Sequence, residues 1–527
     1  MKKILSFIIA LLIVWVGSLL YAGHQTEKLI SQYVNQINQV YQQSYPGVEL
    51  ELKKFDSNFF DAKAQYAIKV NIRKLTDGLN LGLDENDDFI RFLEDAFKTP
   101  IVIDQDIQYG PVFFDEGLEF AMAKISFQST LSNFVKTIAK ELLPRFEDNQ
   151  QKNKEQLDVF ISGLNQVLDK EVVINFESVL PFFSNKAHTS STIGEISVNE
   201  EDTLLTIGKM TFDGVTNMQD FTGHGNFNIP SIISKYKNLQ IFEMQELSIS
   251  YNINEFIDAF NYFGDVKFDV QKVTLDSLTD EGVGLAVALN LKSSRNNKMF
   301  DLSDVEINTT VKMLKYPKQV EAIPFDLPET VFASWSLKGV NNTNFANTMQ
   351  KFKHYLSTID IDNAKFTKIP THLINDIANG LDKSFVKQVT SFNTDLDITT
   401  VKQPKINNTL SLQLIYDFDK GDMMQFLAMI GNDNLKKAGE FVKDKIIVNL
   451  KAKVSAKVLE KFKPMLQTQI QQGIVIEKNG FYQTSVNYQN KKLMVNGKDM
   501  IAIMQQLISP PPVPPVPPVP VPTIKAR

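Results

Sequence analysis

Alternation of apolar and polar residues recurs along this chain and limits its fold more than any other feature. Val266, Phe268 and Val270 are separated by charged or amide residues, and the same spacing returns from Leu285 to Leu291. Period two is the spacing of a β-strand with one buried face, so these two segments predict an antiparallel pair. Other predicted strands are Leu204 to Phe212, Leu247 to Ile253, Leu410 to Tyr416, Ile446 to Val454, Phe481 to Tyr488 and Lys492 to Val495, with turns at Asn479-Gly480 and Asn496-Gly497.

Helical spacing appears in fewer segments. The longest extends from about Leu131 to Leu168 and is interrupted at Pro144, which predicts two helices. Strand segments outnumber helical ones and do not alternate regularly with them. The sequence therefore predicts a β-rich α+β fold with extended, mostly antiparallel sheets and short helices. The other predicted helices are Asn254 to Phe263, Asn344 to Leu356, Pro370 to Val386, Met423 to Ile430 and Ser455 to Gly473.

The N-terminal segment from Ile4 to Ala22 contains no charged residue and follows Lys2 and Lys3. Its length suffices for one transmembrane helix, since a bilayer core is about 30 Å thick and a helix rises about 1.5 Å per residue. Positive residues stay on the cytoplasmic side, so the bulk of the chain is expected in the periplasm. A cleaved signal peptide is the alternative, with cleavage after Ser18 as its better site.

These patterns predict an order of regions along the 527 residues. Pro46 and Gly47 are expected to end a helical stalk that continues the anchor. The proline-rich end is expected to form an exposed polyproline segment, either a docking peptide or an inert spacer. The predicted regions are a membrane anchor or uncleaved signal (1–23), a stalk helix (24–47), a β-rich periplasmic region with a helical insertion near 131–168 (48–340), an α+β C-terminal region (341–508) and a disordered tail (509–527).

Composition excludes several classes of function. The formal net charge of −6 does not suit a nucleic-acid-binding surface, so no nucleic-acid partner is predicted. The sequence lacks cysteine, and its five histidines do not have the spacing of metal ligands. Nucleophile-elbow, Walker A and dinucleotide-binding motifs are missing as well. We therefore predict no catalytic residue, no cofactor and no metal site.

The phenylalanine residues are the more informative side chains. Most of the 38 are expected in the core, because aromatic side chains bury large apolar areas. Adjacent residues on a strand point to opposite faces, so one ring of an adjacent pair needs cover from a second core layer, a partner or a ligand. An ordinary second layer and an apolar groove for acyl chains both satisfy this requirement. The candidate groove residues are Phe59, Phe60, Phe113, Phe114, Phe182 and Phe183.

Three stretches together resemble the bacterial YdgA-like family of uncharacterised envelope proteins. They are the anchor followed by Lys54 to Ala62, the segment Tyr109 to Phe113, and Phe481 to Val486 followed by Leu493 to Lys498. Family members commonly have histidine where this chain has Tyr109, which weakens any chemistry based on that histidine. The resemblance implies a protein of the inner membrane of a Gram-negative bacterium, with a large periplasmic part and with self-association as a homodimer. The layout of one anchor followed by repeated β structure is also similar to that of AsmA-like lipid transporters.

Two classes of function follow from these observations. The first is a non-enzymatic, membrane-anchored envelope protein that handles lipid or scaffolds envelope assembly. The second is a periplasmic hydrolase whose carboxylates meet only in the fold. The first is favoured because an anchor and a β-rich body are predicted, whereas catalytic motifs are missing.

Overall fold

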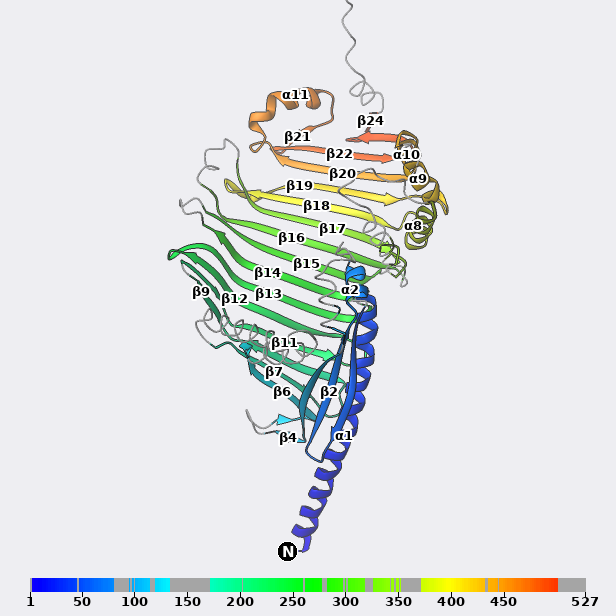
Figure 1. The fold of residues 1–527 in the computed structure, drawn as a ribbon. Coiled ribbons are helices and arrows are strands. Elements are labelled where there is room, and N and C mark those ends of the chain that lie inside the picture. The colour runs from blue at the N-terminus through cyan, green and yellow to red at the C-terminus, as the bar shows by residue number, and fades with distance from the viewer. Residues whose placement is uncertain are drawn as a thin grey trace, which may run out of the picture.

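The structure is a computed structural model of the chain, and it is dominated by one long antiparallel sheet (Figure 1). It describes residues 2–500 except 45–46, 80–93, 95–96, 99, 114–118, 133–170, 201, 259–260, 277–281, 297–298, 300–301, 318–325, 342, 346, 350, 352–370, 432–434 and 444. The β-rich class with few short helices is thus confirmed. The predicted insertion from Leu131 to Leu168, most of the helix from Asn344 to Leu356, and the proline-rich tail lie outside the described residues.

Helix α1 (Lys2–Ser44) precedes the sheet and contains residues 24–44, where the sequence predicts a stalk helix. Among the described residues, no helix has an apolar window that is long enough to cross a membrane. The first strands after α1 are β1 (Val48–Ser57), β2 (Asp61–Val70), β3 (Ile101–Tyr109), β6 (Ala123–Thr130), β7 (Val173–Leu180) and β8 (Lys186–Ile193), with helix α2 (Ile72–Leu79) between β2 and β3. Strands β4 (Val112–Phe113) and β5 (Glu119–Phe120) form a separate two-stranded sheet.

Strand β11 (Met210–Asn217) pairs with β8 on one side and with the first half of β12 (Gly223–Tyr236) on the other. Strand β10 (Thr203–Ile207) pairs with the second half of β12, and β9 (Ile196–Glu200) pairs with β10. A meander follows, in which each strand pairs with its neighbours in sequence. Its strands are β13 (Leu239–Asp258), β14 (Asn261–Leu275), β15 (Val283–Arg295), β16 (Ser303–Lys315), β17 (Pro328–Val340), β18 (Ser391–Thr400), β19 (Gln403–Tyr416), β20 (Ile446–Ser455) and β22 (Phe481–Gln489).

Short elements complete the far end of the sheet. Strands β21 (Ile476–Lys478), β23 (Lys492–Val495) and β24 (Lys498–Asp499) lie at this end. The predicted turn at Asn479-Gly480 joins β21 to β22, and the one at Asn496-Gly497 joins β23 to β24; all four turn residues have positive φ. Helices α8 (Thr371–Ser384), α9 (Asp422–Gly431) and α10 (Leu435–Val442) lie at one end of the strands, and η2 (Glu460–Phe462) with α11 (Lys463–Gln471) lies at the other (Figure 1).

The predicted antiparallel pair is confirmed. Val266, Phe268 and Val270 pair with Leu291, Leu289 and Val287. The predicted helix from Asn254 to Phe263 is wrong, because its described residues form the end of β13 and the start of β14. Bulges in this hairpin shift the alternation, so its local spacing imitates that of a helix.

The predicted strand from Leu204 to Phe212 is two strands, which are separated at Gly208. A Cβ atom at this position would approach the Pro230 ring to 2.9 Å. Strands β17 and β18 pair directly, so the sheet passes through the predicted boundary at residue 340. The division into two regions at this point stays a prediction.

The main buried cluster lies where α1 packs against the first strands. Leu29 and Ile30 of the helix contact a face that carries Ala62, Ala64 and Ile107. Asn38 of α1 also donates a hydrogen bond to the carbonyl oxygen of Leu50 and accepts one from its backbone N–H, over 2.6 and 2.8 Å. Because β1 pairs only with β2 among the described strands, this side chain satisfies backbone groups at the edge of the sheet.

Candidate functional site

One face of the meander is apolar across eight consecutive strands, from β13 to β20. Two rows of directly paired residues follow each other across the sheet on this face. The first row is Tyr251, Val266, Leu291, Ile307, Trp335, Thr394, Leu412 and Leu450. The second row is Ile249, Phe268, Leu289, Thr309, Ala333, Leu396, Leu410 and Ala452. We call the surface formed by these two rows the trough.

The row between them points to the opposite face and is polar throughout. It consists of Ser250, Lys267, Asn290, Asn308, Ser334, Asp395, Ser411 and Lys451. Successive side chains of a strand point to opposite faces, so the sheet has one wet face and one apolar face. Amide side chains stabilise the wet face across strands, since Asn449 donates to Gln413 over 3.0 Å and accepts from Asn487 over 2.6 Å.

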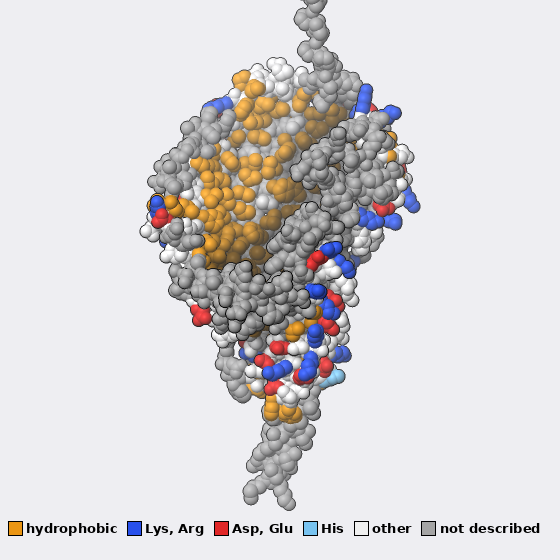
Figure 2. All heavy atoms as spheres, in the orientation of Figure 1, with side chains coloured by type: hydrophobic (Ala, Val, Ile, Leu, Met, Phe, Trp, Pro, Cys, Tyr) orange, Lys and Arg blue, Asp and Glu red, His pale blue; other side chains and the backbone are white. Residues whose placement is uncertain are grey.

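Large side chains of the trough are partly exposed. Leu289 is 36% exposed, and Trp335 and Leu410 are each 40% exposed. Figure 2 shows hydrophobic side chains gathered on a broad, hollowed surface over the central strands. The apolar face of a sheet is normally covered by a second layer of structure. Single exposed apolar residues are common on protein surfaces, whereas a large continuous apolar surface marks an interaction site. The trough is therefore the candidate binding site.

Helix α1 covers the same face of the sheet at its N-terminal end. Ala62 pairs with Ile107, and the row continues through β6, β7, β8, β11 and β12 to Tyr251 of the trough. On α1, Tyr33 lies 5.7 Å from Phe221, whose ring lies 5.4 Å from Phe256 of β13. Burial is the largest cause that raises the pKa of Tyr33, and the nearby Tyr41 and Tyr251 raise it further. The trough thus begins where the helix cover ends.

The model of a bacterial family of unknown function, DUF945, matches residues 1–321, which is more than half of the chain. The chain belongs to this family. Neither the curated proteins nor the solved structures include a significant match. The DUF945 match covers α1, the helix-covered strands and the first part of the trough as far as β16.

Among the described residues, the phenylalanine side chains that the sequence singles out do not line the trough. Phe59 and Phe60 form the turn between β1 and β2, with ring centroids 4.9 Å apart. Phe182 and Phe183 form the turn between β7 and β8. Phe113 is buried with Ala121 and Val179, and Phe114 lies outside the described residues.

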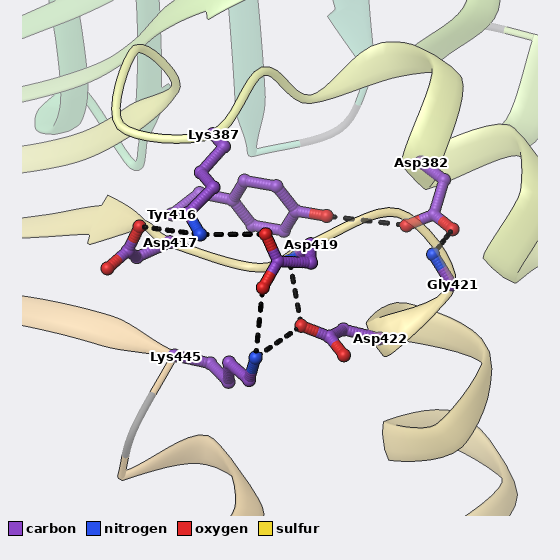
Figure 3. A network of polar contacts seen from close by, with 8 residues as sticks. All are labelled: Asp382, Lys387, Tyr416, Asp417, Asp419, Gly421, Asp422 and Lys445. Carbon is purple, nitrogen blue, oxygen red and sulfur yellow. Dashed lines mark hydrogen bonds and ion pairs between the residues drawn. The ribbon is translucent and has the colours of Figure 1, made fainter.

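A cluster of charged side chains lies at the end of the strands where α8, α9 and α10 pack (Figure 3). Its contacts connect neighbouring elements of the fold. Lys445 lies 2.7 Å from Asp422 and 3.4 Å from Asp419, and Lys387 lies 2.7 Å from Asp419. Hydrogen bonds from Lys387 and Lys445 lower the pKa of Asp419. These ion pairs join the start of β20 to the loop before α9, and they keep the carboxylate of Asp419 charged.

A second part of the same cluster attaches α8. Asp382 accepts hydrogen bonds from the backbone N–H of Gly421 over 2.8 Å and from the Tyr416 hydroxyl over 3.3 Å. Burial raises the pKa of Tyr416, and the charge of Asp382 raises it further. Within the described residues, no group of three or more His, Asp or Glu side chains could hold a metal ion.

A shallow hollow of about 530 Å³ lies on the wet face. Glu306, Asp395 and Lys451 line it together with hydroxyl and amide side chains. Asn308 donates to Glu306 over 2.7 Å, so this carboxylate is part of the polar surface network.

The trough is a candidate site that the sequence patterns do not assign. The sequence predicts its residues only as the buried faces of strands, because alternation alone does not say what covers a face. The signal that could have found it is the size of the side chains. Alanine is frequent on the face under α1, at Ala62 and Ala64, whereas Phe268, Leu289 and Trp335 occupy the face beyond it.

Proposed function

We propose that the protein is a non-enzymatic, membrane-anchored envelope protein of the YdgA-like group that binds lipid acyl chains in the trough. The observation that carries this proposal is the continuous apolar face with large, partly exposed side chains on a sheet whose other face is polar. Full burial of a large apolar side chain contributes about 1.5–3 kcal/mol, so a side chain that is 36–40% exposed contributes about 1 kcal/mol when an acyl chain covers it. Several neighbouring side chains are therefore enough for stable binding.

The dimensions of the trough suit this ligand. Neighbouring strands lie about 4.8 Å apart, so the surface from β13 to β20 is about 34 Å long. One leaflet of a bilayer contributes about half of a core that is roughly 30 Å thick. The trough is thus long enough for extended acyl chains lying across the strands.

The proposed location rests on the sequence of the N-terminal segment. Ile4 to Ala22 is uncharged and follows two lysines, which favours a single span of the inner membrane with the bulk of the chain in the periplasm. Homodimer formation stays a prediction from the family resemblance. A second copy of the chain that packed on the trough would compete with lipid for the same surface.

Lipid extraction from the purified full chain is the first test. The chain is purified from its own membrane, exchanged into a detergent without acyl esters, and measured by native mass spectrometry. We expect phospholipid or another acyl lipid at a fixed stoichiometry. A lipid-free chain with no mass shift after incubation with phospholipid would contradict the proposal.

Tryptophan fluorescence then locates the ligand. The chain has two tryptophans, so Trp15→Phe leaves Trp335 of the trough as the only reporter. Lipid with brominated acyl chains should quench this emission. The matched control carries Trp15→Phe, Trp335→Phe and Ser334→Trp, which moves the reporter one residue along β17 to the wet face. Equal quenching of both reporters would show that lipid binds outside the trough.

The hydrolase hypothesis also stays open. Under this hypothesis, the active site would be the hollow on the wet face, where Glu306 and Asp395 would supply the carboxylates. Its lining is distributed over several strands of the wet face, and the hydrogen bond from Asn308 to Glu306 is a typical contact of a polar sheet surface. We therefore favour the trough as the working surface.

A further inference from the structure

Exposed aromatic side chains gather at the base of the body, where α1 leaves it. Tyr21, Phe59, Phe60 and Phe183 are among the exposed large hydrophobic residues, and Phe60 and Phe183 are 54% and 92% exposed. Figure 2 shows hydrophobic side chains at this point, directly above the N-terminal part of the helix. We call these four residues the collar.

Contacts place the collar around one level of α1. Phe183 lies 6.2 Å from Tyr21, measured between ring centroids. A Cβ atom at Gly23 would lie 3.1 Å from the Ser57 hydroxyl and 3.3 Å from the Tyr109 ring, so the end of β1 is close to the helix there. Phe59 and Phe60 follow this end of β1 in the turn to β2. Two turns and the helix thus present aromatic rings together.

The backbone at Phe183 adds an independent observation. This residue has φ of 59°, in the left-handed region that glycine and asparagine adopt more easily than phenylalanine. An exposed phenylalanine with this φ does not serve the stability of the turn. The side chain is better explained by a contact outside the described body.

We propose that the collar lies in the polar interface of the bilayer that holds the N-terminal segment. The uncharged segment ends at Ala22, next to Tyr21 of the collar, so the membrane boundary and the aromatic rings fall at the same level. Aromatic side chains are enriched at this interface. If the membrane contacts the rings of Phe59, Phe60 and Phe183 as well as the helix, the orientation of the sheet relative to the membrane is fixed. This inference rests on the anchor in the proposed function, but it does not depend on lipid in the trough.

The collar would also set the height of the trough. Tyr33 borders the start of the trough and lies twelve residues after Tyr21 on α1, which corresponds to about 18 Å along the helix. The trough therefore lies outside the bilayer when the collar is seated in its interface. A lipid that reaches Trp335 has then left the bilayer.

Single-tryptophan reporters in the full chain test this inference. The protein is reconstituted in vesicles of phosphatidylethanolamine and phosphatidylglycerol with brominated acyl chains. In the background Trp15→Phe with Trp335→Phe, the reporter is Phe183→Trp or, as a second position, Phe60→Trp. We expect quenching and a shift of the emission to shorter wavelength at both positions. Phe462→Trp, which is exposed at the far end of the sheet, is the matched control and should remain unquenched.

A further variant, with Trp335→Phe alone, retains Trp15 and reports on the anchor itself. Quenched Trp15 with unquenched collar reporters would overturn the collar and leave the anchor intact. Loss of quenching at all three positions would overturn the anchor together with the collar. Collar reporters that are shielded from acrylamide but not quenched by brominated lipid would show a protein partner at this surface, which also contradicts the proposal.

Discussion

The apolar face of the sheet has two regions that differ in the size of their side chains and in what covers them. Under α1, small residues such as Ala62 and Ala64 let the helix approach, and Ile107, which pairs with Ala62, is fully buried in the same cluster. From β13 to β20, Phe268, Leu289 and other large residues form the trough without a helix over it among the described residues. The same alternation of residues therefore yields a closed core in one region and a partly exposed apolar surface in the other.

Replacing an isoleucine by alanine should give the largest difference in the free energy of unfolding between the two regions. Ile107→Ala should lower the free energy of unfolding by about 2–5 kcal/mol, since it leaves a cavity under α1. Ile307→Ala, the matched change in the trough, should lower it by only about 1 kcal/mol. Urea unfolding of the full chain in detergent measures both values. Equal losses would mean that another part of the chain covers the trough as tightly as α1 covers β3.

The pH dependence of stability tests how dry the covered region is. Burial, with a smaller contribution from Tyr33, raises the pKa of Tyr66 from 10.0 to about 12. The unfolded chain therefore releases this proton first as pH rises. Stability should fall between pH 10 and 12 by at most about 2.7 kcal/mol, because one pKa unit corresponds to about 1.36 kcal/mol.

Tyr66→Phe should remove this contribution, and alkaline absorbance titration should lose one late-ionising tyrosine. Thermal unfolding at a series of pH values measures the stability difference. An unchanged pH profile in the variant would show that Tyr66 is not shielded from water.

A charge in the trough should alter binding more than stability. Leu289→Asp should change the free energy of unfolding by less than about 1 kcal/mol, because the side chain is already partly exposed. It should, however, reduce the co-purified lipid several-fold, since a carboxylate against an acyl chain is costly to bury. Asn290→Asp, one residue along β15 and on the wet face, is the control. Similar lipid content in both variants would argue against the trough as the binding surface.

Local sequence was sufficient for much of the sheet and insufficient at its irregular points. The pairing of Phe268 with Leu289 follows from alternation on both sides of a turn. The hairpin between β13 and β14 was missed because bulges near Ile253 and Phe256 break the alternation. The candidate aromatic residues illustrate a further limit. Phe59 and Phe183 are far apart in sequence, and only the packing of both turns at α1 puts them at one level of the molecule.

The sequence by itself determined the β-rich class, several strands such as β15 and β22, and the Asn-Gly turns, because side-chain period and backbone preference are local properties. Only the tertiary structure decided which part of the apolar face is covered. That outcome depends on where α1 packs after the chain reverses at β1, and on the register that aligns one apolar row over eight strands. Contacts between residues distant in sequence set both, and no local periodicity encodes them.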